Sequence, residues 1–302
     1  MRVAVAAAVA LLVAVGVLVD VGLTSGAADP ATVVRTTYGA GAPLCSVTDA
    51  RLGGISGMAV TDDQLWVVDD RGAVVYRLDD RCRVAATFDL APVLKKRGVV
   101  LSDVEDLVLG PEGRLWLADV GGNRASRSGV QLVGWVPGTD DVRRVVLDYP
   151  SGTYDAEAVL IGSDGRAVVV TKVGFGPATV FATDTPLVDG ATIPLVRRGT
   201  VDVDPTGAGG TAARLVTGAA VARSGVFVVL RTYAAAWEYD VPDGDIAEAL
   251  VGGTPRRVAL PESRQGEAIA YDTAGTALLA TTEGLPAAVD RVPVTRVRVP
   301  AS

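Results

Sequence analysis

Polar and apolar residues along this chain follow a unit that recurs about every fifty residues. Each unit begins with one polar residue, continues as a short apolar run, turns at small or acidic residues, and returns as a second apolar run. Short apolar runs bounded by such turns predict β-strands rather than helices. The polar residues that open the five units, called anchors below, are Ser56, Glu105, Glu157, Thr217 and Glu267.

Two more strand-like segments complete each unit, as at 130–135 and 141–147 in the second unit. Four antiparallel strands at this spacing are typical of a propeller blade. The sequence therefore predicts an all-β fold: a single β-propeller of five blades with four antiparallel strands per blade, with a degenerate sixth blade left open. The only helix expected after residue 30 is a short one within 241–250.

Residues 1–28 form a segment of different composition. After Arg2 the chain is apolar from Val3 to Val19 apart from Gly16, and small residues follow at 25–28. This pattern predicts a signal peptide or an N-terminal membrane anchor. Either one makes the chain extracytoplasmic, secreted or anchored to the cell membrane by its N-terminus. Residues 29–44 then form a lead-in that could supply a ring-closing strand, and residues 45–302 form the propeller.

The chain contains two cysteines, Cys45 and Cys82. Because an exported chain with an even number of cysteines commonly pairs them, we expect a disulfide between these two residues. The alternative is a pair of buried thiols without a bond. The predicted disulfide would tie the N-terminal lead-in to the first sheet.

The anchors are expected to form a ring at one rim, because the first strand of each propeller blade lines the central channel. Other polar residues lie in the loops before the anchors or at the returning ends of the second strands: Asp70, Asp103, Asp119, Asp155, Lys172, Arg231 and Glu283. Carboxylates held close together would raise their pKa values or recruit a cation, and oxygen ligands suit Ca²⁺. The possible calcium ligands are Glu105, Asp119, Glu157 and Glu267. In the alternative interpretation, each anchor Glu only accepts backbone hydrogen bonds from the adjacent blade.

Composition removes several classes of chemistry. The chain has no histidine, which excludes Ser-His-Asp and Cys-His nucleophiles and every His-ligated metal site. Its formal net charge is −7, so a nucleic-acid partner lacks the basic face that it requires. Catalysis would have to use carboxylates, hydroxyls, Lys, Arg or a hard cation.

The loop at 119–127 combines two glycines with polar residues, among them Asn123 and Arg124. Because this loop starts at the predicted rim, Asn123 and Arg124 are candidate ligand contacts. The alternative is an ordinary loop between two strands.

Several ordered motifs resemble those of a family of bacterial secreted propellers, the phytase-like "esterase-like activity of phytase" proteins. The motifs are the run DVEDLV from Asp103, the run LWLADVGGNR from Leu115, DAEA from Asp155, TGAA from Thr217 and GEAIA from Gly266. The resemblance covers roughly residues 45–285 and implies a propeller fold with calcium-assisted hydrolysis of a phosphate or other ester. In that family the turn after the second strand usually reads D-[IV]-G-D-N-R. Gly122 stands here in place of the second Asp, which implies a lost ligand if that Asp binds metal.

Two functions follow as hypotheses. The first is binding of a small molecule, a glycan or a protein through the acidic rim, with membrane contact only through an uncleaved N-terminus. The second is a calcium-dependent hydrolase, in which the carboxylates hold Ca²⁺ while Lys172 and Arg231 stabilise an anionic transition state. A propeller fold supports either function, so the fold alone does not choose between them.

Overall fold

The computed structural model describes residues 32–122, 127–204 and 209–300. Residues 36–297 form one compact unit, and the description below concerns that unit; the paired ends of β1 and β21, at 32–35 and 298–300, belong to a second, small unit. The predicted N-terminal segment, 1–28, lies outside the described residues. None of the helices in the described part of the chain is both long and apolar enough to span a membrane.

The strands follow one another in groups of antiparallel neighbours, as the fifty-residue repeat predicts. The first group is one sheet, in the order β3 (Ile55–Thr61), β4 (Gln64–Asp69), β5 (Val74–Leu78) and β6 (Val84–Asp89). Another single sheet contains β15 (Val216–Val221), β16 (Phe227–Thr232), β17 (Ala236–Asp240) and β18 (Arg256–Val258).

Between them lies an eight-stranded sheet made of two successive groups. One group comprises β7 (Val104–Leu109), β8 (Leu115–Asp119), β9 (Gly129–Trp135) and β10 (Val142–Asp148). The other comprises β11 (Ala156–Ile161), β12 (Ala167–Thr171), β13 (Ala178–Thr183) and β14 (Thr192–Val201). Their outer strands β10 and β14 pair in parallel, with Val146 opposite Thr192. This parallel pair departs from the purely antiparallel prediction and reduces the number of sheets to four.

The last group combines both ends of the described chain. It contains β19 (Gly266–Tyr271), β20 (Ala277–Thr282) and β21 (Ala287–Pro300), and β21 pairs with both β1 (Thr32–Tyr38) and β2 (Ala42–Val47). Antiparallel pairing of β2 with β21 places Val47 opposite Ala287. A strand from the N-terminal part of the chain therefore completes the C-terminal sheet.

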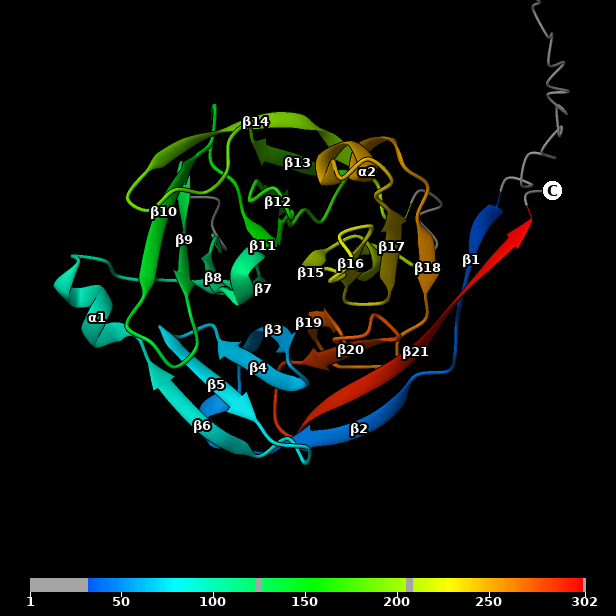
Figure 1. Ribbon diagram of the computed structural model, residues 1–302, viewed down its shortest axis with the longest axis horizontal. Helices are drawn as coiled ribbons and strands as arrows, with labels where there is room; N and C mark the ends of the chain where they lie inside the picture. Colours follow the sequence, from blue (N-terminus) through cyan, green and yellow to red (C-terminus); the bar gives the residue numbers. More distant parts are fainter. Residues whose placement is uncertain (1–31, 123–126, 205–208, 301–302) are drawn as a thin grey trace, which may run out of the picture. The chain divides into compact units, whose positions relative to one another are not determined.

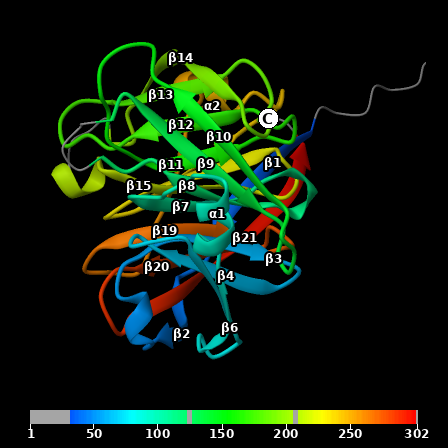
Figure 2. The ribbon, with the colours of Figure 1, turned by 90° about the vertical axis from the view of Figure 1, so that its left-hand side faces the viewer.

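Five inner strands contact each other in a closed circuit: β3 with β7, β7 with β11, β11 with β15, β15 with β19, and β19 with β3. Figure 1 shows these strands nearest the centre of the unit, with the later strands of each group farther out. Figure 2 gives the same strands from the side. The buried apolar side chains form five clusters, each drawn from two neighbouring groups. The core therefore lies between sheet faces, where apolar burial stabilises the ring.

Helices are short and peripheral to the sheets. The segment expected to be helical within 241–250 is α2 (Ile246–Gly252), which begins later because Asp245 caps it by accepting the Glu248 N–H at 3.0 Å. A second helix, α1 (Ala91–Lys96), was not predicted, since six residues are too few to show a helical period.

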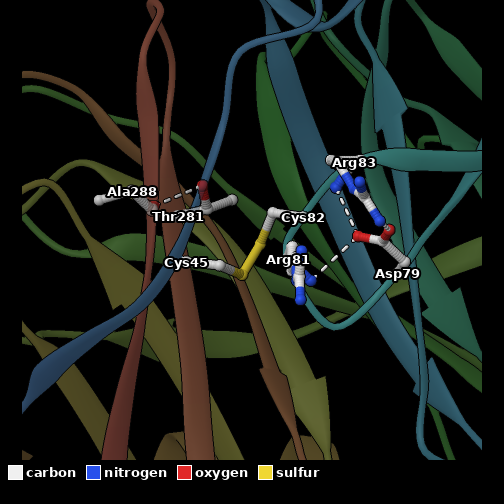
Figure 3. The surroundings of a disulfide bond; sticks show 7 residues. All are labelled: Cys45, Asp79, Arg81, Cys82, Arg83, Thr281 and Ala288. Atoms are coloured by element: carbon white, nitrogen blue, oxygen red, sulfur yellow. Dashed lines mark hydrogen bonds and ion pairs between the residues drawn. A yellow bond between two sulfur atoms is a disulfide. The ribbon is translucent and has the colours of Figure 1, made fainter.

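The predicted disulfide is confirmed: Cys45 of β2 is bonded to Cys82, which lies in the turn between β5 and β6. Figure 3 shows the bond beside the turn that Asp79 organises by accepting the N–H groups of Arg81 and Arg83 at 2.9 and 2.8 Å. Because β2 pairs with β21, the bond links the last sheet to the first.

Candidate functional site

Each innermost strand has an irregular step at its anchor. Pairing with the second strand skips a single residue at Ser56, Glu105, Glu157 and Thr217, and it skips Glu267 together with Ala268. A bulge of this kind leaves a residue out of the ladder and changes the direction of its side chain. The repeated anchor thus corresponds to a repeated β-bulge, and all five anchors are buried.

The two hydroxyl anchors bind neighbouring strands. Ser56 donates its hydroxyl to the Val104 carbonyl at 2.7 Å, and Thr217 donates to the Gly266 carbonyl at 2.8 Å. Each bond runs from one inner strand to another inner strand beside it. The blade-to-blade role that was considered for the glutamates therefore belongs to Ser56 and Thr217.

The three glutamate anchors form a different kind of cluster. Glu105, Glu157 and Glu267 are 9%, 4% and 4% exposed, and they come from β7, β11 and β19. The charge of Glu157 acts on Glu105, and that of Glu267 acts on Glu157. Burial, strengthened by these like charges at Glu105 and Glu157 and by that of Glu283 at Glu267, raises the pKa of all three carboxyl groups, that of Glu267 to about 7.

Lys172, directly after β12, provides the positive charge of this cluster. Its Nζ donates to Glu157 Oε1 and, at 2.8 Å, to the Tyr233 hydroxyl, and it lies 5.1 Å from the centre of the Tyr233 ring. Burial alone would lower the pKa of Lys172, but Glu157, with smaller contributions from Tyr233 and Glu267, outweighs burial and raises it. Lys172 is therefore held as a charged ammonium inside an acidic site.

The loops before the anchors meet the ends of the second strands, as expected for an antiparallel return. Lys172 N–H donates to the Asp155 carbonyl at 2.9 Å, and Glu283 N–H donates to the Gln265 carbonyl at 2.9 Å. The Gln265 amide also donates to the carboxylates of Glu267, at 3.0 Å, and Glu283, at 2.7 Å. Asp155 and Glu283 thus lie at the same end of the channel as the glutamate cluster, and burial raises the pKa of both.

Asp103 and Asp70 extend this acidic region. Asp103 lies close enough to Glu105 that its negative charge adds to the rise in the pKa of Glu105. Burial and the neighbouring charge of Asp69 raise the pKa of Asp70 to about 6, and Glu283 contributes in the same direction. We call the set the acidic rim; it consists of Asp70, Asp103, Glu105, Asp155, Glu157, Lys172, Tyr233, Glu267 and Glu283.

Asp119 does not belong to the acidic rim as the sequence suggested. It is fully buried, and its Oδ1 accepts from Ser102, the Asp103 N–H and Arg127, while Oδ2 accepts from the Gln131 amide at 2.6 Å. Burial would raise its pKa, but the hydrogen bonds from Arg127, Gln131 and the Asp103 N–H, with the charge of Arg127, together outweigh burial and lower it. Both oxygens are already occupied, so Asp119 anchors a loop and is a poor calcium ligand.

Arg231 was expected at the rim and lies instead between strands. It is 2% exposed, and its Nη1 donates to the Ala268 carbonyl of β19 at 2.6 Å. The physical reason is register: Val216 pairs with Thr232, because the turn between β15 and β16 is longer than the repeat predicted. The residue that returns to the rim after β16 is Tyr233, at the position that Lys172 occupies after β12. The sequence analysis missed Tyr233; aligning β16 with β12 would have found it.

The glycines after Asp119 fit closely over the acidic side chains. A Cβ atom on Gly121 would lie 2.4 Å from Asp103 Oδ2 and 2.6 Å from Glu105 Oε1. Gly122 N–H donates to Asp155 Oδ1 at 3.0 Å. Gly122 therefore contacts Asp155 through its backbone N–H group and not through a side chain. Asn123 and Arg124 lie outside the described residues, so their predicted ligand contacts remain predictions.

A further buried carboxyl group was missed. Asp106 is 0% exposed and accepts the N–H groups of Leu107 at 2.9 Å and of Val159, on β11, at 3.0 Å. Burial raises its pKa to about 8. The sequence does mark Asp106 as unusual, because it directly follows an anchor, where the other units have Gly or Ala. Asp106 binds inner strands together beneath the acidic rim.

Within the described ranges, no group of three or more acidic side chains is arranged to hold a metal ion. The calcium site remains a prediction from the resemblance and the composition.

The raised pKa values predict that the protein is less stable at pH 8 than at pH 5. Below about pH 4.5 these carboxyl groups are protonated in both the folded and the unfolded protein. Above that pH the unfolded chain releases protons that the folded chain keeps, and this difference favours unfolding. Stability is thus lost as the pH rises through about 7, the pKa of Glu267, which faces Glu157, Lys172, Arg231 and Glu283. We expect the melting temperature to fall by roughly 3–6 °C from pH 5 to pH 8.

Calorimetry of Glu267→Gln, compared with Glu248→Gln on the exposed side of α2, checks this prediction. Glu267→Gln should reduce the fall, whereas Glu248→Gln should keep it. A melting temperature that rises from pH 5 to pH 8 would contradict the prediction.

Comparisons with known proteins concern the fold. No family model and no curated protein match the chain. The solved structure of a glutaminyl cyclase from Myxococcus xanthus is similar with a TM-score of 0.51 and 12% identity, over 85% of this chain and 97% of that chain. Together with the closed circuit of inner strands, this likeness decides the architecture. The chain is a β-propeller.

Two other structures are more distant from this propeller. A gluconolactonase from Xanthomonas campestris has a TM-score of 0.47 and 14% identity, over 80% of this chain and 72% of that chain. The PQQ-bound aldose sugar dehydrogenase from Streptomyces coelicolor has a TM-score of 0.46 and 10% identity, over 88% and 100%. Identities this low carry no activity over to this propeller.

Proposed function

We propose that this chain is an exported, five-bladed β-propeller that binds a ligand through the acidic rim. The blade count is supported by the five inner strands and the five apolar clusters between neighbouring groups. Four sheets carry five blades because β10 and β14 pair across two of them. Export is supported by the disulfide between Cys45 and Cys82 and by the apolar N-terminal sequence.

One observation carries the ligand-binding proposal: three glutamates from three inner strands converge in buried positions at one end of the channel. Burying carboxyl groups beside each other costs stability, because water no longer solvates them. Ser56 and Thr217 stand at equivalent positions and hold the strands together without charge, so the fold itself does not require glutamate there. Clustered groups with displaced pKa values are typical of functional sites.

A thermal-shift screen of the full chain tests this proposal. The probes are neutral mono- and disaccharides, polyamines, amino acids, short dicarboxylates, and Ca²⁺ with and without EDTA. We expect one class to raise the melting temperature by about 2–5 °C. Glu105→Gln and Glu267→Gln should remove the shift, whereas Asp243→Asn, an exposed change near α2, should retain it.

Two results would overturn binding at the rim: no probe shifts the wild-type protein, or the shift persists in both rim variants. Calcium-dependent turnover of a chromogenic phosphate or acyl ester, abolished by Glu105→Gln, would favour the phytase-like hydrolase over a binding protein.

A further inference from the structure

The acidic rim carries more negative than positive groups. Seven carboxyl side chains lie there with one ammonium, that of Lys172: Asp70, Asp103, Glu105, Asp155, Glu157, Glu267 and Glu283. Among the arginines nearby, Arg71 pairs with Asp69 and also, at 3.6 Å, with Asp70, and Arg127 pairs with Asp119. Arg231 donates to the Ala268 carbonyl, and its charge acts on Glu267. The seven carboxyl groups still outnumber these positive groups. When these carboxyl groups are ionised, they favour a positively charged guest over an anionic one, and a bound cation in turn favours their ionised form.

Two buried oxygens of the acidic rim accept no hydrogen bond among the described residues, Asp70 Oδ1 and Glu157 Oε2, and only Asp70 Oδ1 has an arginine nearby, Arg71 at 3.6 Å. Glu157 Oε2 is buried and accepts no hydrogen bond, although Lys172 occupies the other oxygen of the same carboxyl group. The Glu157 side chain is 5% exposed, and its charge is coupled to those of Glu105 and Glu267. A buried acceptor without a donor costs stability, so a guest that supplies an N–H or O–H group there would recover that cost.

An exposed aromatic residue follows Lys172 closely along the chain. Phe175 is 90% exposed and follows Lys172 by three positions, in the segment that connects β12 to β13. Gly174 and Gly176 flank it, and Gly176 has a φ of +72°, a conformation that glycine adopts without strain. A phenylalanine this exposed, three positions after a rim residue, suits contact with an alkyl chain or with a cation.

Resting on the proposed function, we propose that the acidic rim binds the ammonium group of a primary organic amine. The ammonium donates to Glu157 and its neighbouring carboxylates, and the alkyl part of the amine lies against Phe175. A neutral alcohol can donate to Glu157 Oε2 but leaves the excess negative charge unbalanced, and a carboxylate adds to it. Amines are therefore the ligand class that meets the charge, the missing donor and the exposed ring together.

The experiment is calorimetric titration of the full chain with three ligands that share a five-carbon chain: n-pentylamine, 1-pentanol and pentanoate. We expect pentylamine to bind at least about ten-fold more tightly than pentanol, and pentanoate not to bind. Glu157→Gln should weaken pentylamine binding about ten-fold, and 0.5 M NaCl should weaken it as well, because charge attraction is screened. Glu248→Gln is the matched control and should leave the affinity unchanged.

Phe175→Ser provides a second variant, one at an exposed position that does not threaten folding. It should weaken pentylamine about three-fold or more and leave methylamine unchanged, because methylamine has no chain to contact the ring. Equal binding of pentanol and pentylamine, or full pentylamine affinity in Glu157→Gln, would overturn the amine assignment. A saccharide shift that depends on Glu105 and Glu267, without amine binding, would overturn this inference and leave rim binding intact; no binding of any probe would overturn both.

Discussion

Glu238→Gln is expected to lower the free energy of unfolding by about 3–5 kcal/mol, the range for removing one partner of a buried ion pair. Glu238 lies on β17, is 0% exposed and accepts four hydrogen bonds. Tyr38 at 2.6 Å and Arg256 at 3.1 Å donate to Oε2, while Tyr271 at 2.8 Å and Arg296 donate to Oε1. One carboxylate thus joins β1, β17, β18, β19 and β21. An amide in its place removes the counter-charge of Arg296 and leaves Arg256 with Asp240 alone.

Urea unfolding of Glu238→Gln and Asp240→Asn measures this effect against a matched control. Asp240 pairs with the same Arg256, at 2.6 Å, but its side chain is 57% exposed. Because exposed ion pairs contribute little, Asp240→Asn should cost less than about 1 kcal/mol. If the two variants lose the same stability, the network around Glu238 is not what holds these strands.

Replacing both cysteines, by Cys45→Ala with Cys82→Ala, should lower the free energy of unfolding by about 3–4 kcal/mol, because the bond closes a long loop in the unfolded chain. The two residues are 37 positions apart, and the bond joins β2 of the last sheet to the first sheet. The melting temperature should fall by roughly 5–10 °C.

Differential scanning calorimetry with and without a reductant provides the control. The wild-type protein in reductant should melt near the temperature of the double variant, and the reductant should leave the double variant unchanged. A wild-type protein that melts at the same temperature in both conditions would show that the bond adds no stability.

The repeat and its anchors were readable from sequence because each anchor occupies a repeated backbone position. Glu105, Glu157 and Glu267 each interrupt the ladder at a bulge, and a polar residue before an apolar run records that bulge in the sequence. That Asp103, Asp155 and Lys172 lie at the same end of the channel followed from one fact alone, that the second strand of each unit runs antiparallel to the first. Tyr233 was missed and Arg231 misplaced because the turn between β15 and β16 is longer than those of the second and third units, and turn length varies from unit to unit.

Closure of the ring was also only partly predictable. The lead-in at 29–44 was expected to supply a closing strand, and the structure pairs β21 with β1 and with β2, whose last residues reach Val47. The four hydrogen bonds to Glu238 could not be predicted from nearby residues, since one donor, Tyr38, lies 200 positions away from it in the chain.

By itself the sequence determined that this chain forms a β-propeller with repeated inner strands, a disulfide and an acidic set of anchors without histidine. Those properties depend on short apolar runs, on turns, on the repeat of about fifty residues and on residue types, all of which can be read along the chain. Only the tertiary structure decided that Asp119 and Arg231 leave the rim, that Tyr233 joins it, and that Glu157 keeps one buried oxygen without a donor. These outcomes depend on register and on contacts between distant strands, which form only when the ring closes.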